Sequence, residues 1–334
     1  MVMKKFINDP QNLTLELLEG LALSYPDKVQ LVSGRIVVRV NPKSKNKIAV
    51  MTIGGSGHEP ALTGYVGDGM LDASVAGDIF AAPGAPMILE ALRLFKDHAG
   101  VLLIILNHEG DVMNGNMAFN MAVKEGINVR KVLTCEDIAA GIAAPKEDRR
   151  GLGGAMLVYK IAGAAAEAGK SFDEIVAVSE RFSENMATLA VTMKTATHPQ
   201  SGQYIATLPD DKLEIGMGQH GEGGGVGPQP MATADVVAET MVEKLIVAIK
   251  AKSGDNVVLV INGSGATTLM EMLIVFRKAY KVLESKGIKV VYSRCEEMLT
   301  VQEAAGFQMI LAQVDAEQLG YLKASSDAPY WVTR

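Results

Sequence analysis

The chain of 334 residues has few cysteines, few aromatic side chains and no long apolar run, and each shortage argues against a class of protein. Its two cysteines, Cys135 and Cys295, stand alone, without a CxxC pair or a histidine at metal-ligand spacing. We therefore expect no metal site, and two buried thiols in a reducing compartment. Aromatic residues make up 5% of the chain, too few to suggest a platform on which nucleic acid bases stack.

Clustered positive charge and apolar segments of membrane-spanning length are missing as well. The net charge is −6, and the longest basic cluster, Lys43–Lys47, lies among proline, serine and asparagine residues that are typical of a solvated turn. Because phosphate binding requires a concentrated basic patch, we expect no nucleic acid partner. No apolar run approaches the roughly 18 residues of a membrane span, and residues 1–9 lack the apolar core of a signal peptide. We expect a cytoplasmic protein without membrane contact.

What the chain does have is glycine, together with short apolar segments that alternate with helical patterns. Hydrophobic residues make up 48% of the sequence, and 34 residues are glycine. Segment 101–107 (VLLIILN) is almost wholly apolar, as expected for a parallel strand that is covered on both faces. Strands are predicted at 47–53, 101–107, 128–133, 187–194, 213–218, 256–261, 289–293 and 308–314, and helices at 112–125, 151–168, 172–185, 234–250 and 267–285.

This alternation predicts an α/β fold with two domains. At roughly 100–200 residues per domain, the length is large for one core and comfortable for two. A pair of helices ends near Asn185, and we place the boundary there, which gives an N-terminal α/β domain at 1–185 and a C-terminal α/β domain at 186–334. Both domains are expected to hold mostly parallel or mixed sheets, with glycine-rich loops at the strand ends.

Two glycine motifs look like nucleotide-binding loops but fail on spacing or context. Residues 163–171 (GAAAEAGKS) place five residues between the glycines where a phosphate loop has four, and they end a helix instead of opening one. Gly169 is expected to be the C-cap of that helix. Residues 216–221 (GMGQHG) match GxGxxG, but a loop rich in glycine and proline follows in place of a helix. We expect neither motif to bind a nucleotide.

Two loops in the first half follow strands and place a polar side chain beside glycines. Open α/β sheets bind ligands at the carboxyl ends of their strands. In 54–60 (GGSGHEP), the glycines let backbone amides approach a ligand and His58 follows them, although a simple glycine turn with His58 at a helix start fits the same pattern. In 107–111 (NHEGD), Asp111 is either a catalytic carboxylate or the N-cap of the following helix.

A third loop, 214–225, surrounds His220 with glycines. Little side-chain packing is expected around this imidazole. The loop is therefore either a mobile surface segment or an unhindered nucleophile of the kind that attacks a carbonyl carbon.

Taken in order, several segments resemble the substrate-binding subunit or domain of dihydroxyacetone kinases, and together they span most of the chain. The segments that carry the resemblance are 4–10 (KKFINDP), 54–60 (GGSGHEP), the strand that precedes Gly110-Asp111, 149–167 (RRGLGGAMLVYKIAGAAAE) and 214–222 (EIGMGQHGE). No single segment is specific, but the set in this order is.

The resemblance implies a role for each candidate residue. His220 matches the histidine that forms a hemiaminal with the ketone carbon of the substrate, and His58 and Asp111 match residues that contact the substrate and manage protons. A backbone cradle and one further polar contact complete the expected substrate site, at Gly55, Ser56, Gly57 and His108.

The resemblance also implies partners. It implies a homodimer that binds a small ketose but no cofactor of its own, and that acts with a separate helical subunit carrying the nucleotide. That partner uses ATP with magnesium directly, or an ADP cofactor that a phosphocarrier of the phosphotransferase system rephosphorylates. The expected activity is that of a phosphotransferase with an alcohol group as acceptor.

Four places depart from the family pattern and indicate a divergent member. Leu106 stands where the family commonly has a lysine, and segments 197–203, 262–265 and 296–300 differ from the usual sequences. Three alternatives follow: a dihydroxyacetone kinase subunit, a subunit for a larger ketose such as erythrulose, or a non-catalytic paralogue. The paralogue would sense a ketose through His220 and co-activate a transcriptional regulator.

Overall fold

The computed structural model describes residues 4–224 and 226–334 and divides into two compact units. The first unit holds the residues up to Thr134 together with 155–181 and 320–334, and the second holds 135–154 and 182–319. The sequence instead suggested a single boundary after Asn185. A pattern of strands and helices shows where elements lie along the chain but not which of them pack together. The sequence therefore could not show that 135–154 belongs to the second unit and 155–181 to the first.

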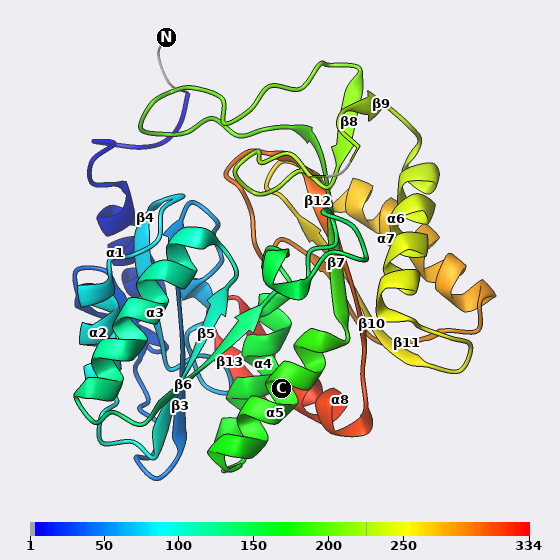
Figure 1. Cartoon of the computed structure of the whole chain (residues 1–334). Coiled ribbons are helices and arrows are strands. Elements are labelled where there is room, and N and C mark those ends of the chain that lie inside the picture. The colour runs from blue at the N-terminus through cyan, green and yellow to red at the C-terminus, as the bar shows by residue number, and fades with distance from the viewer. Residues whose placement is uncertain (1–3, 225) are drawn as a thin grey trace. The chain divides into compact units, whose positions relative to one another are not determined.

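The first unit is built on a mixed sheet of six strands in the order β1-β2-β4-β3-β5-β6 (Figure 1). The pairs β4–β3, β3–β5 and β5–β6 are parallel, whereas β1–β2 and β2–β4 are antiparallel. The strands are β1 (Val29–Ser33), β2 (Ile36–Arg39), β3 (Ile48–Ser56), β4 (Ala73–Ile79), β5 (Gly100–Leu106) and β6 (Val129–Thr134).

Helices cover both faces of this sheet. Helices α2 and α3 lie side by side, and α3 packs closely because a Cβ on its Gly115 would come within 2.6 Å of Ile105 (Figure 1). Thr52 points to the opposite face, where its hydroxyl lies 2.8 Å from the Tyr159 hydroxyl of α4. The helices are α1 (Leu13–Ser24), α2 (Ala85–Leu94), α3 (Glu109–Lys124), α4 (Ala155–Glu167), α5 (Phe172–Glu184) and α8 (Ala316–Lys323), with the short helix η1 (Thr63–Tyr65) and the hairpin β13 (Ser326–Ala328) and β14 (Trp331–Thr333).

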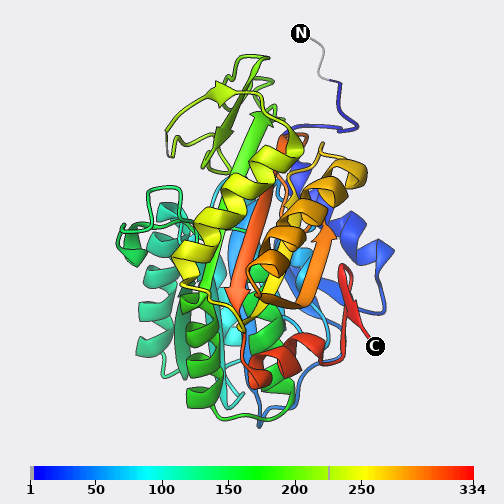
Figure 2. The same cartoon turned by 90° about the vertical axis from the view of Figure 1, so that its right-hand side faces the viewer.

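The second unit has its own sheet of six strands, in the order β11-β10-β12-β7-β8-β9. Only β10 and β11 pair in parallel; the other pairs are antiparallel. Helices α6 and α7 lie across one face and bury the apolar core (Figure 2). The elements are η2 (Lys146–Asp148), β7 (Met186–Lys194), β8 (Lys212–Ile215), β9 (Gln229–Pro230), α6 (Ala234–Ile249), β10 (Asn256–Gly263), α7 (Leu269–Ser285), β11 (Lys289–Glu296) and β12 (Ala305–Gln313).

The predicted fold class, two α/β parts with mixed sheets, is confirmed. Among the described residues, no helix combines the length and the apolar character needed to cross a bilayer. The two cysteines are free but only partly buried, not fully buried as expected. Desolvation nevertheless raises the pKa of each thiol to about 11, so neither is an activated nucleophile.

Candidate functional site

The two candidate loops of the first unit leave neighbouring strands at the same edge of the sheet. Strands β3 and β5 are parallel, with Ile53 paired to Ile105, so the loops that follow them emerge together. Strand β3 was expected to end at Ile53, but it continues to Ser56 and bulges between Gly54 and Ser56. The glycines wrongly suggested the end of the strand. Backbone pairing with β4 continues through them, because this pairing requires no side chains.

The glycines of this loop serve a close approach of backbone to backbone. A Cβ on Gly55 would lie 2.8 Å from the Ala81 nitrogen, and Gly57 has a φ of +98°. The buried Ser56 hydroxyl donates to the Gly77 carbonyl at 2.9 Å, and the Gly57 N–H donates to a Glu59 carboxylate oxygen at 3.0 Å. Two of the expected cradle groups therefore already hold the loop in shape, and a ligand must displace or share these hydrogen bonds.

Two of the polar candidates of the first unit lie at the start of helix α3, and the third, His58, follows strand β3. His58 is 6% exposed, and its ring centroid lies 5.2 Å from that of Phe80. The N-cap of α3 is His108, with extended backbone, and Asp111 lies in the first helical turn. The alternative role of Asp111 as N-cap is therefore wrong, because the helix begins at Glu109 and not at Val112.

His220 lies in the second unit, in a tight loop that follows β8. The Gly218 N–H donates to the Glu222 carbonyl at 2.8 Å, which closes the loop around His220. One Glu222 carboxylate oxygen lies 3.2 Å from Nδ1 of the His220 ring, and the other accepts the His220 backbone N–H at 2.9 Å. The side chain of His220 is 29% exposed, so the ring is held yet still accessible.

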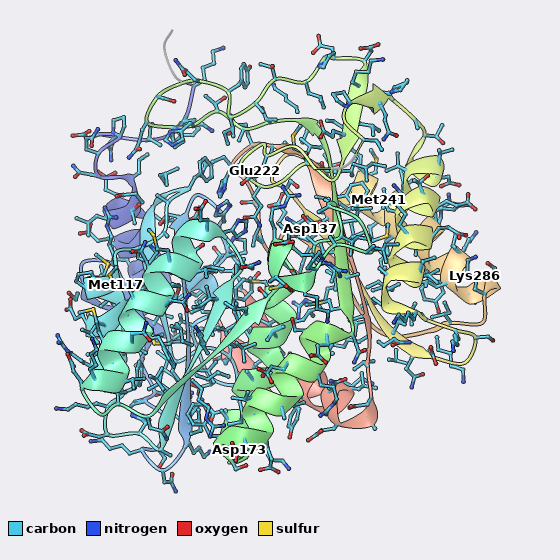
Figure 3. All side chains as sticks on the ribbon, viewed as in Figure 1. Met117, Asp137, Asp173, Glu222, Met241 and Lys286 are labelled. Atoms are coloured by element: carbon cyan, nitrogen blue, oxygen red, sulfur yellow. The ribbon has the colours of Figure 1, made fainter. Side chains whose placement is uncertain are left out.

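Arg150 binds the backbone of this loop, and Asp137 holds Arg150 in place. Arg150 donates to the carbonyl of Gly216 at 2.8 Å and to that of Glu222 at 3.3 Å, which ties both ends of the loop together. Its guanidinium also pairs with the buried Asp137 at 2.7 Å. Figure 3 labels Asp137 and Glu222, the two acidic ends of this network. We call these four side chains, Asp137, Arg150, Glu222 and His220, the histidine network.

Hydrogen bonds favour the ionised form of Glu222. Partial burial acts to raise the pKa of Glu222, but hydrogen bonds from the His220 ring and backbone outweigh it and lower that pKa to about 2. Burial raises the pKa of Asp137, and the Arg150 guanidinium opposes that rise. A Cβ on Gly218 would lie 2.1 Å from the guanidinium and 2.2 Å from the Glu222 carboxylate, so only glycine leaves room for them.

This arrangement selects the reactive nitrogen of His220. When an ionised carboxylate accepts from Nδ1–H, the ring is fixed in the tautomer whose Nε2 carries the lone pair. Such a nitrogen is a nucleophile suited to an electrophilic carbon. The sequence indicated His220 but not its partners, because Glu222 and Arg150 were each only one residue of a segment that carries the resemblance.

A small cavity of about 20 Å³ lies beside the His220 loop, room for roughly one water molecule. Gln219 lines it and is buried, and its amide nitrogen has no hydrogen-bond partner among the described residues. The other lining side chains include hydroxyls and an amide, on Thr192, Thr195, Ser264 and Gln308. This is a polar recess next to the His220 loop.

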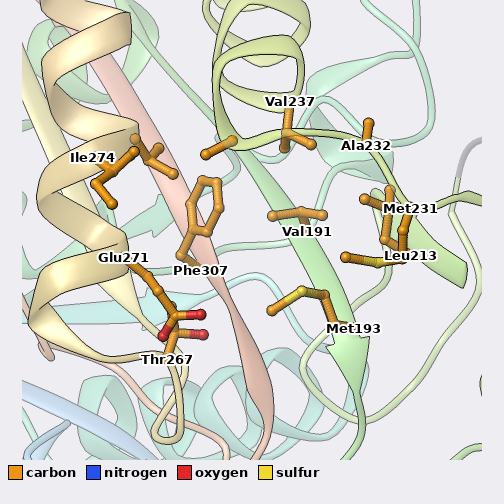
Figure 4. A pocket seen from close by; sticks show the side chains of 12 residues that line it. Val191, Met193, Leu213, Met231, Ala232, Val237, Thr267, Glu271, Ile274 and Phe307 are labelled. Carbon is orange, nitrogen blue, oxygen red and sulfur yellow. The ribbon is translucent and has the colours of Figure 1, made fainter. Parts of the chain in front are cut away.

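A larger cavity of about 200 Å³ in the second unit has a different character. It is lined by apolar side chains of β7, β12, α6 and α7, with Glu271 and Thr267 at one end (Figure 4). Glu271 is engaged in the capping box of α7 with Thr268, and the Thr267 hydroxyl accepts the Gly306 N–H. A polyhydroxylated ketose would find few free partners there.

Comparison with known proteins identifies the family of this chain. A family model described as the Dak1 domain matches residues 19–330. The chain belongs to the Dak1 domain family. It is 37% identical over 330 residues to the PTS-dependent dihydroxyacetone kinase 1, dihydroxyacetone-binding subunit DhaK, of Listeria innocua serovar 6a, covering 98% of this chain and 100% of that one.

Two solved structures are similar to this Dak1 domain. A dihydroxyacetone kinase operon co-activator, DhaQ, matches with a TM-score of 0.90 and 32% identity, covering 96% of this chain and 98% of that one. The dihydroxyacetone kinase of C. freundii matches with a TM-score of 0.89 and 29% identity, covering 99% of this chain and 61% of that longer one. The backbone is thus shared by a kinase and by a co-activator.

The departures from the Dak1 pattern differ in burial: segment 197–203 is largely exposed, whereas the other three lie in packed surroundings. Leu106 is the buried last residue of β5. The buried Asn262 accepts the N–H groups of Met298 and Leu299 and donates to the Leu299 carbonyl, which joins segments 262–265 and 296–300. This amide side chain therefore adds to the β10–β11 pairing, which already places Asn262 beside Glu296.

Proposed function

We propose that this chain is the ketose-binding subunit of a dihydroxyacetone-type kinase and that it holds its substrate covalently on His220. The observation that carries the proposal is the histidine network, which presents Nε2 of a held imidazole in a loop built for it. Membership of the Dak1 family and the likeness to a dihydroxyacetone-binding subunit support the same function.

The covalent step is an addition to the ketone. Nε2 of His220 forms a bond to the carbonyl carbon, the C=O π bond breaks, and the oxygen takes up a proton as the imidazole gives one up. No water is lost in this step. The addition is reversible, because the carbon–nitrogen bond breaks when the carbonyl group re-forms. A ketose is accepted and glycerol is refused, because glycerol has no carbonyl to attack.

The first unit supplies the groups that handle protons. His58 follows β3 and Asp111 follows β5, and these two strands are parallel neighbours. We assign either Asp111 or His58 as the group that accepts the proton of the substrate hydroxyl during phosphoryl transfer. His108 and the Gly55–Gly57 segment contact the substrate hydroxyls. The tether fixes the position of the reacting hydroxyl, which lowers the entropic part of the barrier.

The phosphoryl group comes from a separate subunit. That partner carries ATP with magnesium, or an ADP that a phosphocarrier of the phosphotransferase system recharges, and its metal ions stabilise the charge of the transferred group. This chain binds no cofactor in the proposal, and it works as a homodimer. Dihydroxyacetone is the expected substrate, with erythrulose as the larger alternative.

The test is a phosphorylation assay with a purified nucleotide-bearing kinase subunit and each ketose, followed by ³¹P NMR of the product. Asp111→Asn should retain the ketose adduct on His220 and lose turnover by about a hundredfold or more, because general base catalysis commonly contributes that much. His58→Asn is the matched variant. Full turnover in both variants would contradict the assignment of the proton acceptor.

A second candidate function is ketose sensing in a co-activator, and the similarity to the co-activator structure favours it. The sensor keeps the adduct on His220 but has no phosphoryl transfer. The control is a nucleotide-bearing subunit that phosphorylates dihydroxyacetone when it is combined with its own partner. If this subunit gives no product with the present chain while the adduct on His220 still forms, the result favours the sensor.

A further inference from the structure

Helix α3 carries an exposed stripe of three methionines, Met113, Met117 and Met121, that the proposed chemistry does not use. They recur every four residues, so they lie on one side of the helix. Their exposed fractions are 60%, 53% and 36%. Figure 3 labels Met117, the central member, on this helix. We call these three side chains the methionine stripe.

The stripe is unusual for a helix surface. The inner side of α3 buries Gly115, Ala118 and Ala122 against the sheet, as an amphipathic helix should. The outer side should then be charged, yet residues 112–123 carry no charged side chain. Exposed clusters of long apolar residues mark surfaces that bind a partner. Methionine in particular is flexible and suits contacts that form and release.

The position of the stripe indicates what covers it. Met113 lies two residues beyond Asp111, and His108 caps the same helix, so the stripe begins where the proposed proton acceptor stands. A chain that brings a phosphate to a hydroxyl beside Asp111 must contact the molecule at this end of α3. The occupant is therefore expected to be the phosphate donor, provided that the proposed function holds.

The size of a protein contact extends this argument to the whole stripe. A standard interface covers about 800 Å² on each partner, equivalent to a disc of roughly 16 Å radius. From Met113 to Met121 the helix rises about 12 Å. A footprint that starts at the first turn of α3 and extends along the helix is thus large enough to include all three methionines.

We propose that the methionine stripe is the docking surface for the nucleotide-bearing subunit, which meets it with an apolar patch next to its phosphates. This inference rests on the proposed function and names the surface by which its partner binds. Binding through the stripe would orient the donor towards the first turn of α3.

The test varies the concentration of a purified nucleotide-bearing kinase subunit loaded with ATP and magnesium, at saturating dihydroxyacetone. Met117→Lys should raise the half-saturating subunit concentration by about tenfold or more, as expected when a charge replaces an apolar contact at the centre of an interface. The rate at saturating subunit should stay within about twofold. Met113→Lys is a second variant, and circular dichroism checks that both fold.

Val247→Lys is the matched control, because Val247 is also 60% exposed but lies on α6. It should leave the half-saturating concentration unchanged. An unchanged value in Met117→Lys and Met113→Lys, with normal turnover of the wild type, would overturn the docking proposal alone. So would a change of the chain's own oligomeric state in these variants, which would assign the stripe to a second copy. Absence of turnover in the wild type would instead overturn the proposed function.

Discussion

His220 depends on a carboxylate two residues away. Glu222 holds both the Nδ1 position of the ring and the backbone N–H of His220, so it fixes the ring and the loop together. Partners of this kind, which orient a reactive group, are commonly worth about ten- to a hundredfold in binding or activity, as for residues that support metal ligands.

We expect Glu222→Ala to weaken the ketose adduct by about tenfold or more. Glu222→Gln should have an intermediate effect, because its single amide oxygen can accept only one of the two hydrogen bonds well. The measurement is the apparent dissociation constant of dihydroxyacetone by NMR titration. Equal constants for the wild type and Glu222→Ala would show that the carboxylate does not position the ring.

Arg150 has a neighbour that provides an internal comparison. Arg150→Met leaves the carboxylate of Asp137 buried without its cation, which typically costs about 3–5 kcal/mol. Arg149 donates to the backbone carbonyls of Ile142 and Ala144, so Arg149→Met should cost less, about 1 kcal/mol. Urea unfolding of both variants tests this. Similar losses would contradict the special role of Arg150.

The sequence could indicate the reactive candidates but not the residues that position them. His58, Asp111 and His220 are visible because each follows an apolar strand and has a glycine beside it in the sequence. Arg150 is separated from Glu222 by 72 residues, and only the fold brings them into contact. Hydrogen bonds between such distant side chains leave no periodic pattern, so the histidine network could not be predicted.

At the scale of elements, the segment after β6 is held by a buried carboxyl group. Glu136 is fully buried, and one of its oxygens accepts the Leu152 N–H at 2.7 Å, while the other has no partner among the described residues. Desolvation raises the pKa of Glu136 to about 7 despite these backbone donors. At neutral pH this carboxyl group is close to the midpoint of its titration.

A pH dependence follows from this shift. Because the pKa of Glu136 is higher in the folded than in the unfolded chain, the folded state keeps a proton that the unfolded state releases as the pH rises above about 4.5. Its contribution to the free energy of unfolding therefore falls by about 3 kcal/mol between pH 4.5 and 7 and then levels off.

Glu136→Gln should remove this fall, since the amide mimics the protonated acid, and should stabilise the protein at pH 8. Denaturant unfolding at several pH values measures it, with the exposed Glu147→Gln as the control of equal charge change. Parallel pH profiles for the wild type and Glu136→Gln would contradict the raised pKa.

Strands and helices with a clear pattern of apolar residues were predicted well. Short strands, and strands rich in small residues, were not. The apolar strand β5 and helix α6 lie within a residue or so of their expected bounds. Strand β4, with the sequence ASVAGDI, and the short β1 and β2 were missed, because their few apolar residues do not alternate clearly. Their pairing is fixed by neighbouring strands and not by their own composition.

At the scale of the molecule, the candidate residues are divided between the two units. His58, His108 and Asp111 belong to the first, whereas the whole histidine network belongs to the second. Covalent capture and proton transfer are thus assigned to separate parts of the chain. This division is why substitution of Asp111 is expected to stop turnover and leave the adduct in place.

The central claim is that His220 binds a ketose covalently, and mass spectrometry of the intact protein under native conditions tests it most directly. The wild type should gain the full mass of one ketose, without loss of water, after incubation with dihydroxyacetone or erythrulose. Neither glycerol with the wild type nor dihydroxyacetone with His220→Ala should give this gain. A ketose adduct that persists in His220→Ala, or no adduct with either ketose in the wild type and in soaked crystals, would contradict the account.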